Sequence, residues 1–194
     1  MPGSTASLGA ADVVALALAR PATLGSGRLV CIDGPAGSGK STLAAQVADQ
    51  RPEAWIVHLD DLYDGWDGLG RLTDQLAGLL RPLATGRPGS YRCYDWEAGH
   101  YAETRLVGPG PLLVLEGVGA GSRDHADLTT VLVWVEAPRD VRMARGLARD
   151  GAAFAPHWER WATGEAEHFA RHDTRSRADV CLDTTPPGAQ RRLG

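Results

Sequence analysis

Residues 34–41 of the sequence, GPAGSGKS, combine residue types that bind phosphate at the spacing GxxxxGK[ST]. The glycines of this segment allow positive φ angles, so successive N–H groups can converge on phosphate oxygens without a Cβ atom in the way. A helix that begins near Lys40 would direct its N-terminal dipole at the same anion, with the Lys40 ammonium on the β and γ phosphates and the Ser41 hydroxyl toward magnesium. The motif therefore predicts a site for ATP and Mg²⁺, formed by Gly34, Pro35, Ala36, Gly37, Ser38, Gly39, Lys40, Ser41 and Thr42.

The alternative reading of this segment is a chance glycine-rich turn. The motif, however, lies between an apolar run that reads as a strand and a segment that reads as a helix, which is the context that a phosphate loop requires. Lys40 is also the only lysine in the chain, in which every other strongly basic side chain is arginine. A compact ammonium is the group that phosphate chemistry needs at this position.

Three carboxylates follow apolar runs elsewhere in the chain. Asp60 and Asp61 come at the end of the run 54–59, and Glu116 follows LLVL and precedes Gly117. A carboxylate at a strand end can accept a proton from a hydroxyl group, hold magnesium, or simply cap a turn or mark the exit of a strand to solvent. We expect one of the two aspartates to be catalytic, and we expect Ser41, Asp60 and Glu116 on the magnesium side of the site.

The elements that would position these residues alternate between strands and helices. Apolar runs predict strands at 28–33, 54–59, 111–116, 129–135 and 178–182, and helical spacing predicts helices at 10–19, 41–50, 69–80, 138–150 and 156–171. This order predicts an α/β fold, a three-layer α/β/α arrangement with a mostly parallel five-stranded sheet. Because ligands bind at the carboxyl ends of parallel strands, the loop and the carboxylates should share one edge. Residues 82–101 read as a loop.

Composition places limits on the class of protein. A chain of 194 residues is long enough for one domain with a full core, and a net charge of −4 gives no sign of a nucleic-acid partner. No segment has the apolar length of a membrane span, three scattered cysteines suit a reducing compartment, and the six histidines lack metal-ligand spacing. We expect a cytoplasmic protein that acts on a small molecule, without nucleic-acid, membrane or zinc binding. The oligomeric state stays open.

Aromatic residues gather in one irregular part of the sequence, and they are Tyr63, Trp66, Tyr91, Tyr94 and Trp96. They could form a stacking wall for a flat or sugar-like molecule. They could equally form a small core beneath a long loop, an alternative of similar weight for Trp66 and Trp96. Trp158, Trp161 and Phe169 are more consistent with packing than with ligand contact.

An ordered series of motifs resembles the uridine kinase-like P-loop kinases. The series runs from the phosphate loop through DDLY (60–63), YDW (94–96), LEG (115–117) and RD (149–150) to ADV (178–180). Taken singly, only the phosphate loop is specific; the order is what carries the resemblance, which spans about residues 28–182. The resemblance implies one kinase domain over 1–194, with a core at 28–182, an N-terminal helix and linker at 1–27, and an arginine-bearing helix and helical lid at about 142–177.

The resemblance also implies roles for individual residues. Asp60 would be the general base for the acceptor hydroxyl, and Tyr63 and Tyr94 would contact the acceptor. Arg145 and Arg149, and less clearly Arg142, would reach the phosphates, although arginines at this spacing also occur on solvated helix faces. With Lys40, these residues give the catalytic set Asp60, Lys40, Arg145 and Arg149. The set expected to bind the acceptor is Asp60, Asp61, Tyr63, Tyr94, Trp96 and Glu116.

The sequence departs from this family's pattern at the acceptor site. A family histidine that touches the base corresponds to Gly99, with His100 one residue away, and Asp67 is only a weak match for the aspartate that grips the ribose. A kinase that phosphorylates a nucleoside such as uridine or cytidine is therefore the first hypothesis. The alternatives are a kinase for another hydroxylated metabolite or a nucleoside monophosphate, and a regulatory P-loop ATPase or switch. ATP and GTP both remain open as the donor.

Overall fold

The computed structural model describes residues 8–151 and 155–186 of the chain. Residues 1–7 and 187–194 of the predicted domain, and residues 152–154 of the predicted lid, lie outside this description. None of the helices in the described ranges combines the length and the apolar character needed to cross a membrane.

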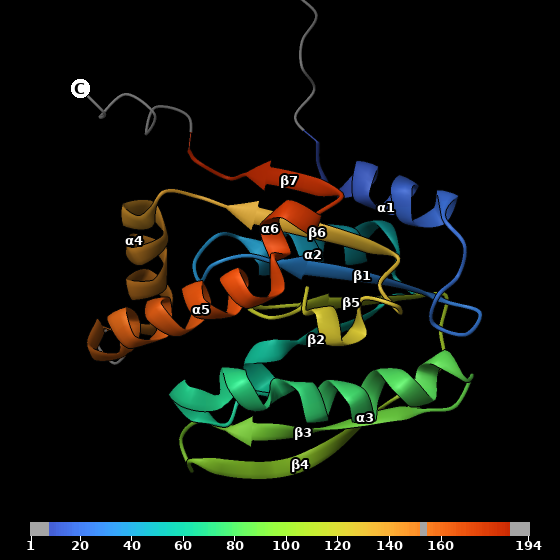
Figure 1. The fold of residues 1–194 in the computed structure, drawn as a ribbon, viewed down its shortest axis with the longest axis horizontal. Helices are drawn as coiled ribbons and strands as arrows, with labels where there is room; N and C mark the ends of the chain where they lie inside the picture. Colours follow the sequence, from blue (N-terminus) through green and yellow to red (C-terminus); the bar gives the residue numbers. More distant parts are fainter. Residues whose placement is uncertain (1–7, 152–154, 187–194) are drawn as a thin grey trace, which may run out of the picture.

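A five-stranded parallel sheet forms the centre of the fold, with the strand order β2-β5-β1-β6-β7 (Figure 1). This arrangement confirms the predicted mostly parallel sheet. The five strands are β1 (Arg28–Asp33), β2 (Trp55–His58), β5 (Leu112–Glu116), β6 (Val131–Glu136) and β7 (Val180–Asp183).

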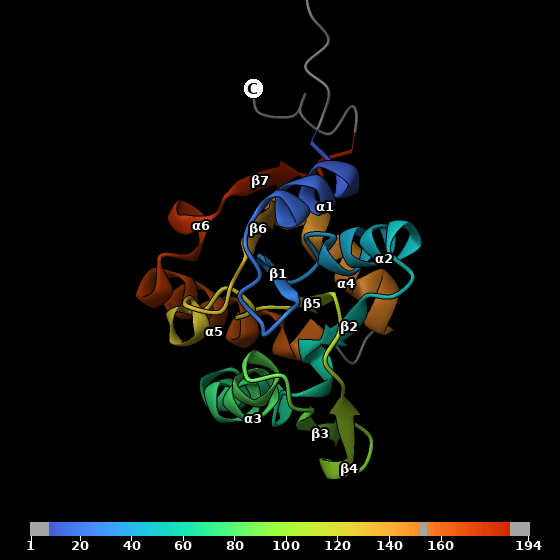
Figure 2. The same ribbon diagram turned by 90° about the vertical axis from the view of Figure 1, so that its right-hand side faces the viewer.

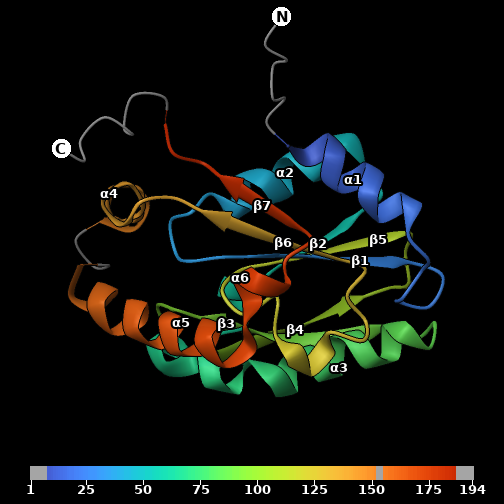
Figure 3. The ribbon, with the colours of Figure 1, turned by 45° about the horizontal axis from the view of Figure 1, so that its top comes forward.

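Helices cover both faces of this sheet, which confirms the three-layer arrangement. Figure 2 shows α1 and α2 on one side of the sheet and α5 and α6 on the other, and Figure 3 shows the same layers with α3 on the side of α5. The helices are α1 (Ala10–Ala19), α2 (Lys40–Gln50), α3 (Leu72–Ala84), α4 (Arg139–Asp150), α5 (Trp158–His172) and α6 (Thr174–Arg177). Short 3₁₀ turns occupy Leu59–Asp61, Gly65–Arg71, Arg123–His125 and Ala155–His157.

The continuous apolar run of β1 is explained by burial on both faces. Val30 and Ile32 pack into a core shared with α1 and α2, whereas Leu29 and Cys31 pack into a second core shared with α3. Side chains alternate between the faces of a strand, so a strand that is covered on both sides needs apolar residues at every position. This double burial fixes the end of β1, where the phosphate loop begins.

The segment expected to be a loop at 82–101 is mostly regular structure, so that prediction was wrong. Helix α3 continues to Ala84, and β3 (Gly89–Asp95) pairs antiparallel with β4 (His100–Val107). The signal was present in β3, where Tyr91 and Cys93 are buried and Arg92 between them is exposed. Proline, glycine and tyrosine at its ends obscured this period-two pattern, and β4 is exposed over most of its length and shows little alternation. The hairpin packs against α3 beside β2, below the sheet in Figure 1.

Candidate functional site

The phosphate loop connects the end of β1 to the start of α2, as the motif requires. Gly34, Gly37 and Gly39 have φ angles of 142°, 76° and 100°. An added Cβ atom at Gly34 would lie 2.0 Å from the carbonyl oxygen of Val135, and one at Gly37 would lie 2.4 Å from that of Arg142. The loop therefore needs glycine at both positions for backbone conformation and for space.

Lys40 lies across this loop from the first turn of α2. Its Nζ donates hydrogen bonds to the carbonyl oxygens of Gly34, at 2.8 Å, and Pro35, at 3.1 Å. The side chain is buried, with 7% of the residue exposed, yet it lines the main cavity of the protein. These two hydrogen bonds to neutral carbonyl groups fix the position of the ammonium without neutralising its charge. The ammonium can therefore bind an anion above the loop.

Asp33 secures the base of the loop, and nothing in our sequence analysis identified it. Its Oδ1 accepts hydrogen bonds from the N–H groups of Gly34, at 2.7 Å, and Gly119, at 3.0 Å, and its Oδ2 accepts one from Gly121 at 2.8 Å. Complete burial raises the pKa of Asp33 to about 6, although the three N–H bonds and the charge of Lys40 oppose this rise. A charged residue at the end of an otherwise apolar strand was the available signal.

Glu116 meets the first turn of α2 at the carboxyl end of β5. Ser41 Oγ donates to Glu116 Oε1 at 3.1 Å, and His58 Nδ1 lies 2.5 Å from the same oxygen. Burial raises the pKa of Glu116, but the hydrogen bond from His58 and the charges of Lys40 and His58 outweigh burial, and the net shift is downward. The same hydrogen bond raises the pKa of His58. His58, on β2, was not among the predicted site residues.

The donor set at this position fits magnesium. A hydroxyl oxygen and a buried carboxylate kept ionised at neutral pH are hard oxygen ligands, which Mg²⁺ prefers alongside phosphate oxygens and water. Among the described residues no group of three or more His, Cys, Asp or Glu side chains forms a separate metal cage. Ser41 and Glu116 are thus the residues that could hold the ion at the phosphate end of the cavity. Asp60, the third residue expected on the magnesium side, lines the same cavity.

Asp60 and Asp61 differ in their surroundings, although both line the cavity from the turn after β2. Asp60 Oδ2 lies 3.9 Å from Arg149 Nη1, and both side chains are more than half exposed. Asp61 Oδ2 accepts a hydrogen bond from Arg105, on β4, at 2.9 Å. The hairpin thus contacts the side chain of Asp61, whereas the side chain of Asp60 lies beside Arg149 of α4.

Three of the four arginines of α4, the three that the sequence connected with phosphate, reach different places. Arg145 donates to the carbonyl oxygen of Gly37 at 3.3 Å and to that of Thr184 at 2.7 Å, and it lines the cavity. Arg149 lines the cavity near Asp60. Arg142 does not line the cavity and instead donates to the carbonyl oxygen of Ala36, on the far side of the loop, at 3.1 Å.

Aromatic side chains form the wall of the cavity beyond Asp60. Tyr63, Trp66, Trp96 and Trp161 line it, and Trp96 Nε1 donates to the carbonyl oxygen of Asp60 at 2.9 Å. Trp66 makes edge contacts with Trp96 and Trp161, with ring centroids 5.2 Å and 6.1 Å apart. Trp161, which the sequence indicated as packing, contributes to both the core and this wall.

Two residues that the sequence connected with the acceptor lie outside this wall. Tyr94 is not among the lining residues and packs edge-on against Trp96, with ring centroids 5.4 Å apart. Asp67 forms an exposed ion pair with Arg160 of α5. Tyr94 therefore supports the tryptophan that lines the cavity rather than facing the cavity itself.

One continuous cavity of about 1000 Å³ connects these features. Its lining includes the phosphate loop and the start of α2, the carboxylates Asp60, Asp61 and Glu116, and the aromatic wall. The charged side chains among its lining residues are Lys40, Asp60, Asp61, Glu116, Arg145, Arg149 and Asp183.

Comparisons with known proteins agree with this geometry. A sequence profile of the "Phosphoribulokinase / Uridine kinase family" matches residues 69–154. Uridine kinase of Borreliella burgdorferi (strain ZS7) is 23% identical over 141 residues, which covers 63% of this chain and 67% of that protein. The uridine kinase of Borrelia garinii subsp. bavariensis is 23% identical over 138 residues, with the same coverage.

Solved structures show the same fold. A structure described as a possible uridine kinase from Bacillus stearothermophilus aligns with a TM-score of 0.57 and 21% identity, covering 81% of this chain and 89% of that one. A structure described as a candidate fructose transport system kinase from Silicibacter sp. TM1040 aligns with a TM-score of 0.61 and 22% identity, covering 91% of this chain and 100% of that one. The resemblance to uridine kinase-like P-loop kinases is confirmed, and the chain has the fold of a phosphotransferase of this kind.

Proposed function

We propose that the protein transfers the γ-phosphoryl group of ATP to a hydroxyl group of a small, uncharged acceptor, with a nucleoside such as uridine or cytidine as the first candidate. One observation carries this proposal: a single cavity joins the phosphate loop and Lys40 to a carboxylate, Asp60, and to an aromatic wall. A triphosphate and a flat, hydroxylated molecule can occupy its two ends with their reacting groups close to Asp60.

The nucleotide end supplies positioning and charge. The loop N–H groups and the dipole of α2 would bind the β-phosphate, and the Lys40 ammonium would bind the β and γ oxygens. Ser41 and Glu116 would hold Mg²⁺, which when bound neutralises charge on the phosphate oxygens. Arg149, which lies beside Asp60, would stabilise the charge on the phosphoryl group during its transfer. This use of magnesium and a nucleoside triphosphate is our reason for proposing a cytoplasmic location.

Asp60 would act as the general base. The acceptor oxygen forms a bond to the γ-phosphorus while the bond between that phosphorus and the β–γ bridging oxygen breaks, which leaves ADP. The acceptor hydroxyl gives its proton to the Asp60 carboxylate. We prefer Asp60 over Asp61 because Asp60 is the aspartate that the resemblance to uridine kinase-like kinases matches to the general base.

The charges at the acceptor end favour an uncharged acceptor over a nucleoside monophosphate. The cations among the described lining residues, which are Lys40, Arg145 and Arg149, all contact or approach the phosphate loop or Asp60. No other cation is among the described lining residues, so the aromatic side chains themselves would offer none to a second phosphate, and Asp60 and Asp61 would repel one. Aromatic faces suit a sugar ring or a pyrimidine base.

A coupled assay of ADP release tests the proposal. Purified protein with ATP and Mg²⁺ should hydrolyse little ATP alone, and should release ADP rapidly when the correct member of a panel of nucleosides, sugars and other polyols is added. A nucleoside monophosphate panel forms the comparison arm. Rapid turnover of a monophosphate would contradict the uncharged acceptor, and steady hydrolysis without dependence on an acceptor would favour a regulatory ATPase.

A further inference from the structure

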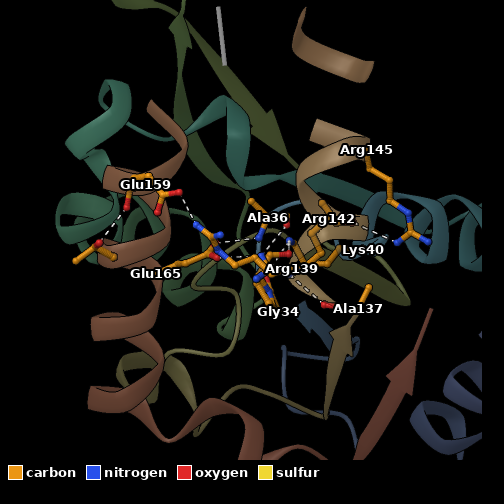
Figure 4. Close-up of polar contacts among 12 residues, drawn as sticks. Gly34, Ala36, Lys40, Ala137, Arg139, Arg142, Arg145, Glu159 and Glu165 are labelled. Atoms are coloured by element: carbon orange, nitrogen blue, oxygen red, sulfur yellow. Dashed lines mark hydrogen bonds and ion pairs between the residues drawn. The ribbon is translucent and has the colours of Figure 1, made fainter. Parts of the chain in front are cut away.

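Both backbone polar groups of one phosphate-loop residue, Ala36, are held by charged side chains from outside the loop. The N–H of Ala36 donates to Glu165 Oε2 at 2.9 Å, and the carbonyl oxygen of Ala36 accepts from Arg142 Nη1 at 3.1 Å. Glu165 belongs to α5 and Arg142 to α4, so two helices meet at this residue (Figure 4). Neither side chain lines the cavity in which a nucleotide would lie.

Burial gives these contacts their strength. Glu165 is 3% exposed, and the Arg142 side chain is 12% exposed. Arg142 Nη1 lies 3.2 Å from Glu165 Oε1, its Nε donates to the carbonyl oxygen of Ala137 at 3.1 Å, and its guanidinium lies over the ring of Trp158. A buried ion pair contributes little net stability, but removing one partner leaves a costly unpaired charge.

The backbone of α4 also contacts the loop directly. The carbonyl oxygen of Arg142 occupies the space that a Cβ atom of Gly37 would need. Thus α4 contacts both Ala36 and Gly37, while α5 contacts Ala36 through Glu165. These contacts fix the part of the loop between Gly34 and Lys40, where backbone N–H groups must converge on phosphate.

We infer that Glu165 and Arg142 are positioning residues, which hold the backbone on both sides of Ala36 so that the phosphate loop is preformed for the nucleotide. The inference rests on the proposed function, because it assigns the loop to a nucleoside triphosphate. In this inference Arg142 acts by holding the loop backbone at Ala36 and does not contact phosphate itself. It also explains why an acid occurs on the buried face of α5, four residues after Trp161.

If Glu165 acted only through its charge, removing that charge would strengthen nucleotide binding, whereas the positioning role predicts that losing the hydrogen bond weakens it. A carboxylate near Lys40 would repel a triphosphate, so removing its charge would tighten nucleotide binding, whereas positioning requires the acceptor oxygen and its reach. Burial raises the pKa of Glu165, and the Ala36 N–H bond and the charges of Lys40 and Arg142 oppose that rise. Two substitutions separate charge from reach: E165Q removes the charge and keeps an acceptor oxygen, whereas E165D keeps the charge and shortens the side chain.

The test is the dissociation constant of MgATP, measured by calorimetry on the full chain without any acceptor. We expect E165D to weaken binding about tenfold, because the buried Ala36 N–H loses its partner, and E165Q to stay within about threefold of wild type. The double variant R139A/E159A is the matched control, since this exposed pair also joins α4 to α5. It should leave the dissociation constant unchanged. A thermal melt of each variant reports folding separately.

Two patterns would overturn the inference. One is unchanged binding in E165D, with or without a lower melting temperature, because the residue would then serve stability alone. The other is tighter binding in E165Q with E165D like wild type, the electrostatic result. The binding measurement uses no acceptor, so the two proposals can fail separately. If wild type binds MgATP but the acceptor panel gives no phosphorylated product, the proposed function is contradicted and this inference stands.

Discussion

The two ends of the cavity are built in different ways. At the nucleotide end, Lys40 and Asp33 are buried and bonded to backbone groups, and glycines determine the path of the chain. At the acceptor end, the side chains of Asp60 and Arg149 are more than half exposed, and Trp96 is 42% exposed. The first end comes from short segments on neighbouring strands, whereas the second combines the turn after β2, the hairpin and parts of α4 and α5.

This difference separates the binding of the nucleotide from the recognition of the acceptor. Preformed N–H groups and a buried lysine can bind any nucleoside triphosphate, so the nucleotide end says little about the substrate. The acceptor end depends on exposed side chains whose identity can change without disturbing the core. Substitutions at the nucleotide end should therefore affect nucleotide binding and catalysis together, and substitutions at the acceptor end should affect catalysis or acceptor binding alone.

The largest effect is expected for K40A. The substitution removes the buried ammonium that faces the phosphates, so we expect kcat to fall by about a thousandfold and MgATP binding to weaken. K40R should not restore activity, because a planar guanidinium is larger than the ammonium that donates to the Gly34 and Pro35 carbonyls. ADP release and calorimetry measure the two effects. Wild-type turnover in K40A would remove Lys40 from the mechanism.

D60N should separate catalysis from nucleotide binding. Asparagine keeps the size of the side chain but cannot take the proton of the acceptor hydroxyl, so we expect a loss of about a hundredfold or more in kcat with MgATP binding retained. The matched control is D61N, whose partner is Arg105 and which should keep most of the activity. Equal activity of D60N and wild type, or a larger loss in D61N, would transfer the role of base away from Asp60.

The buried carboxyl group of Asp33 should make the stability of the nucleotide end depend on pH. Its pKa of about 6 in the folded protein lies above the ordinary value of 3.8, so the folded state binds the proton more tightly than the unfolded state does. Stability should therefore fall as pH rises from about 4 to about 6, by up to about 3 kcal/mol, and stay level above that range. D33N should lack this component.

Urea unfolding at a series of pH values measures this effect as the difference between wild type and D33N. Subtracting the variant's curve removes the contribution of the other titrating groups that the two proteins share. A constant difference across pH 4 to 7 would show that Asp33 ionises in the folded protein as it does in the unfolded chain.

The sequence predicted the nucleotide end well because its determinants are local. Glycine spacing, the single lysine and continuous apolar strands predict the loop and its place at the sheet edge, and the order of strands and helices predicts the parallel sheet. Two of the buried acids, Asp33 and Glu165, were not predicted. Glu165 interrupts the buried face of α5 and Asp33 ends β1, but only tertiary contacts with Ala36 and with Gly119 and Gly121 give these acids a role.

The acceptor end was harder to predict because its residues come together through packing. The β3–β4 hairpin was expected to be a loop, yet it brings Arg105 to Asp61 and Trp96 to Asp60. Trp161 is distant from the hairpin in the sequence and reaches the wall because α5 packs against the 3₁₀ segment Gly65–Arg71, which carries Trp66. Pattern and spacing cannot predict such contacts, since no local periodicity encodes them.

The smallest effect that still distinguishes the two ends is expected for W96A. Trp96 lines the cavity with 42% of its surface exposed, and its loss removes one aromatic face together with a hydrogen bond to the Asp60 carbonyl oxygen. We expect the KM for the acceptor to rise about tenfold while the KM for ATP stays unchanged, because the phosphate loop does not contact this side chain. W55A is the matched control: Trp55 is similarly exposed, at 44%, but lies on β2 outside the cavity. A rise in the KM for ATP alone would mean that the tryptophan serves the donor, and that the division between the two ends is wrong at this residue.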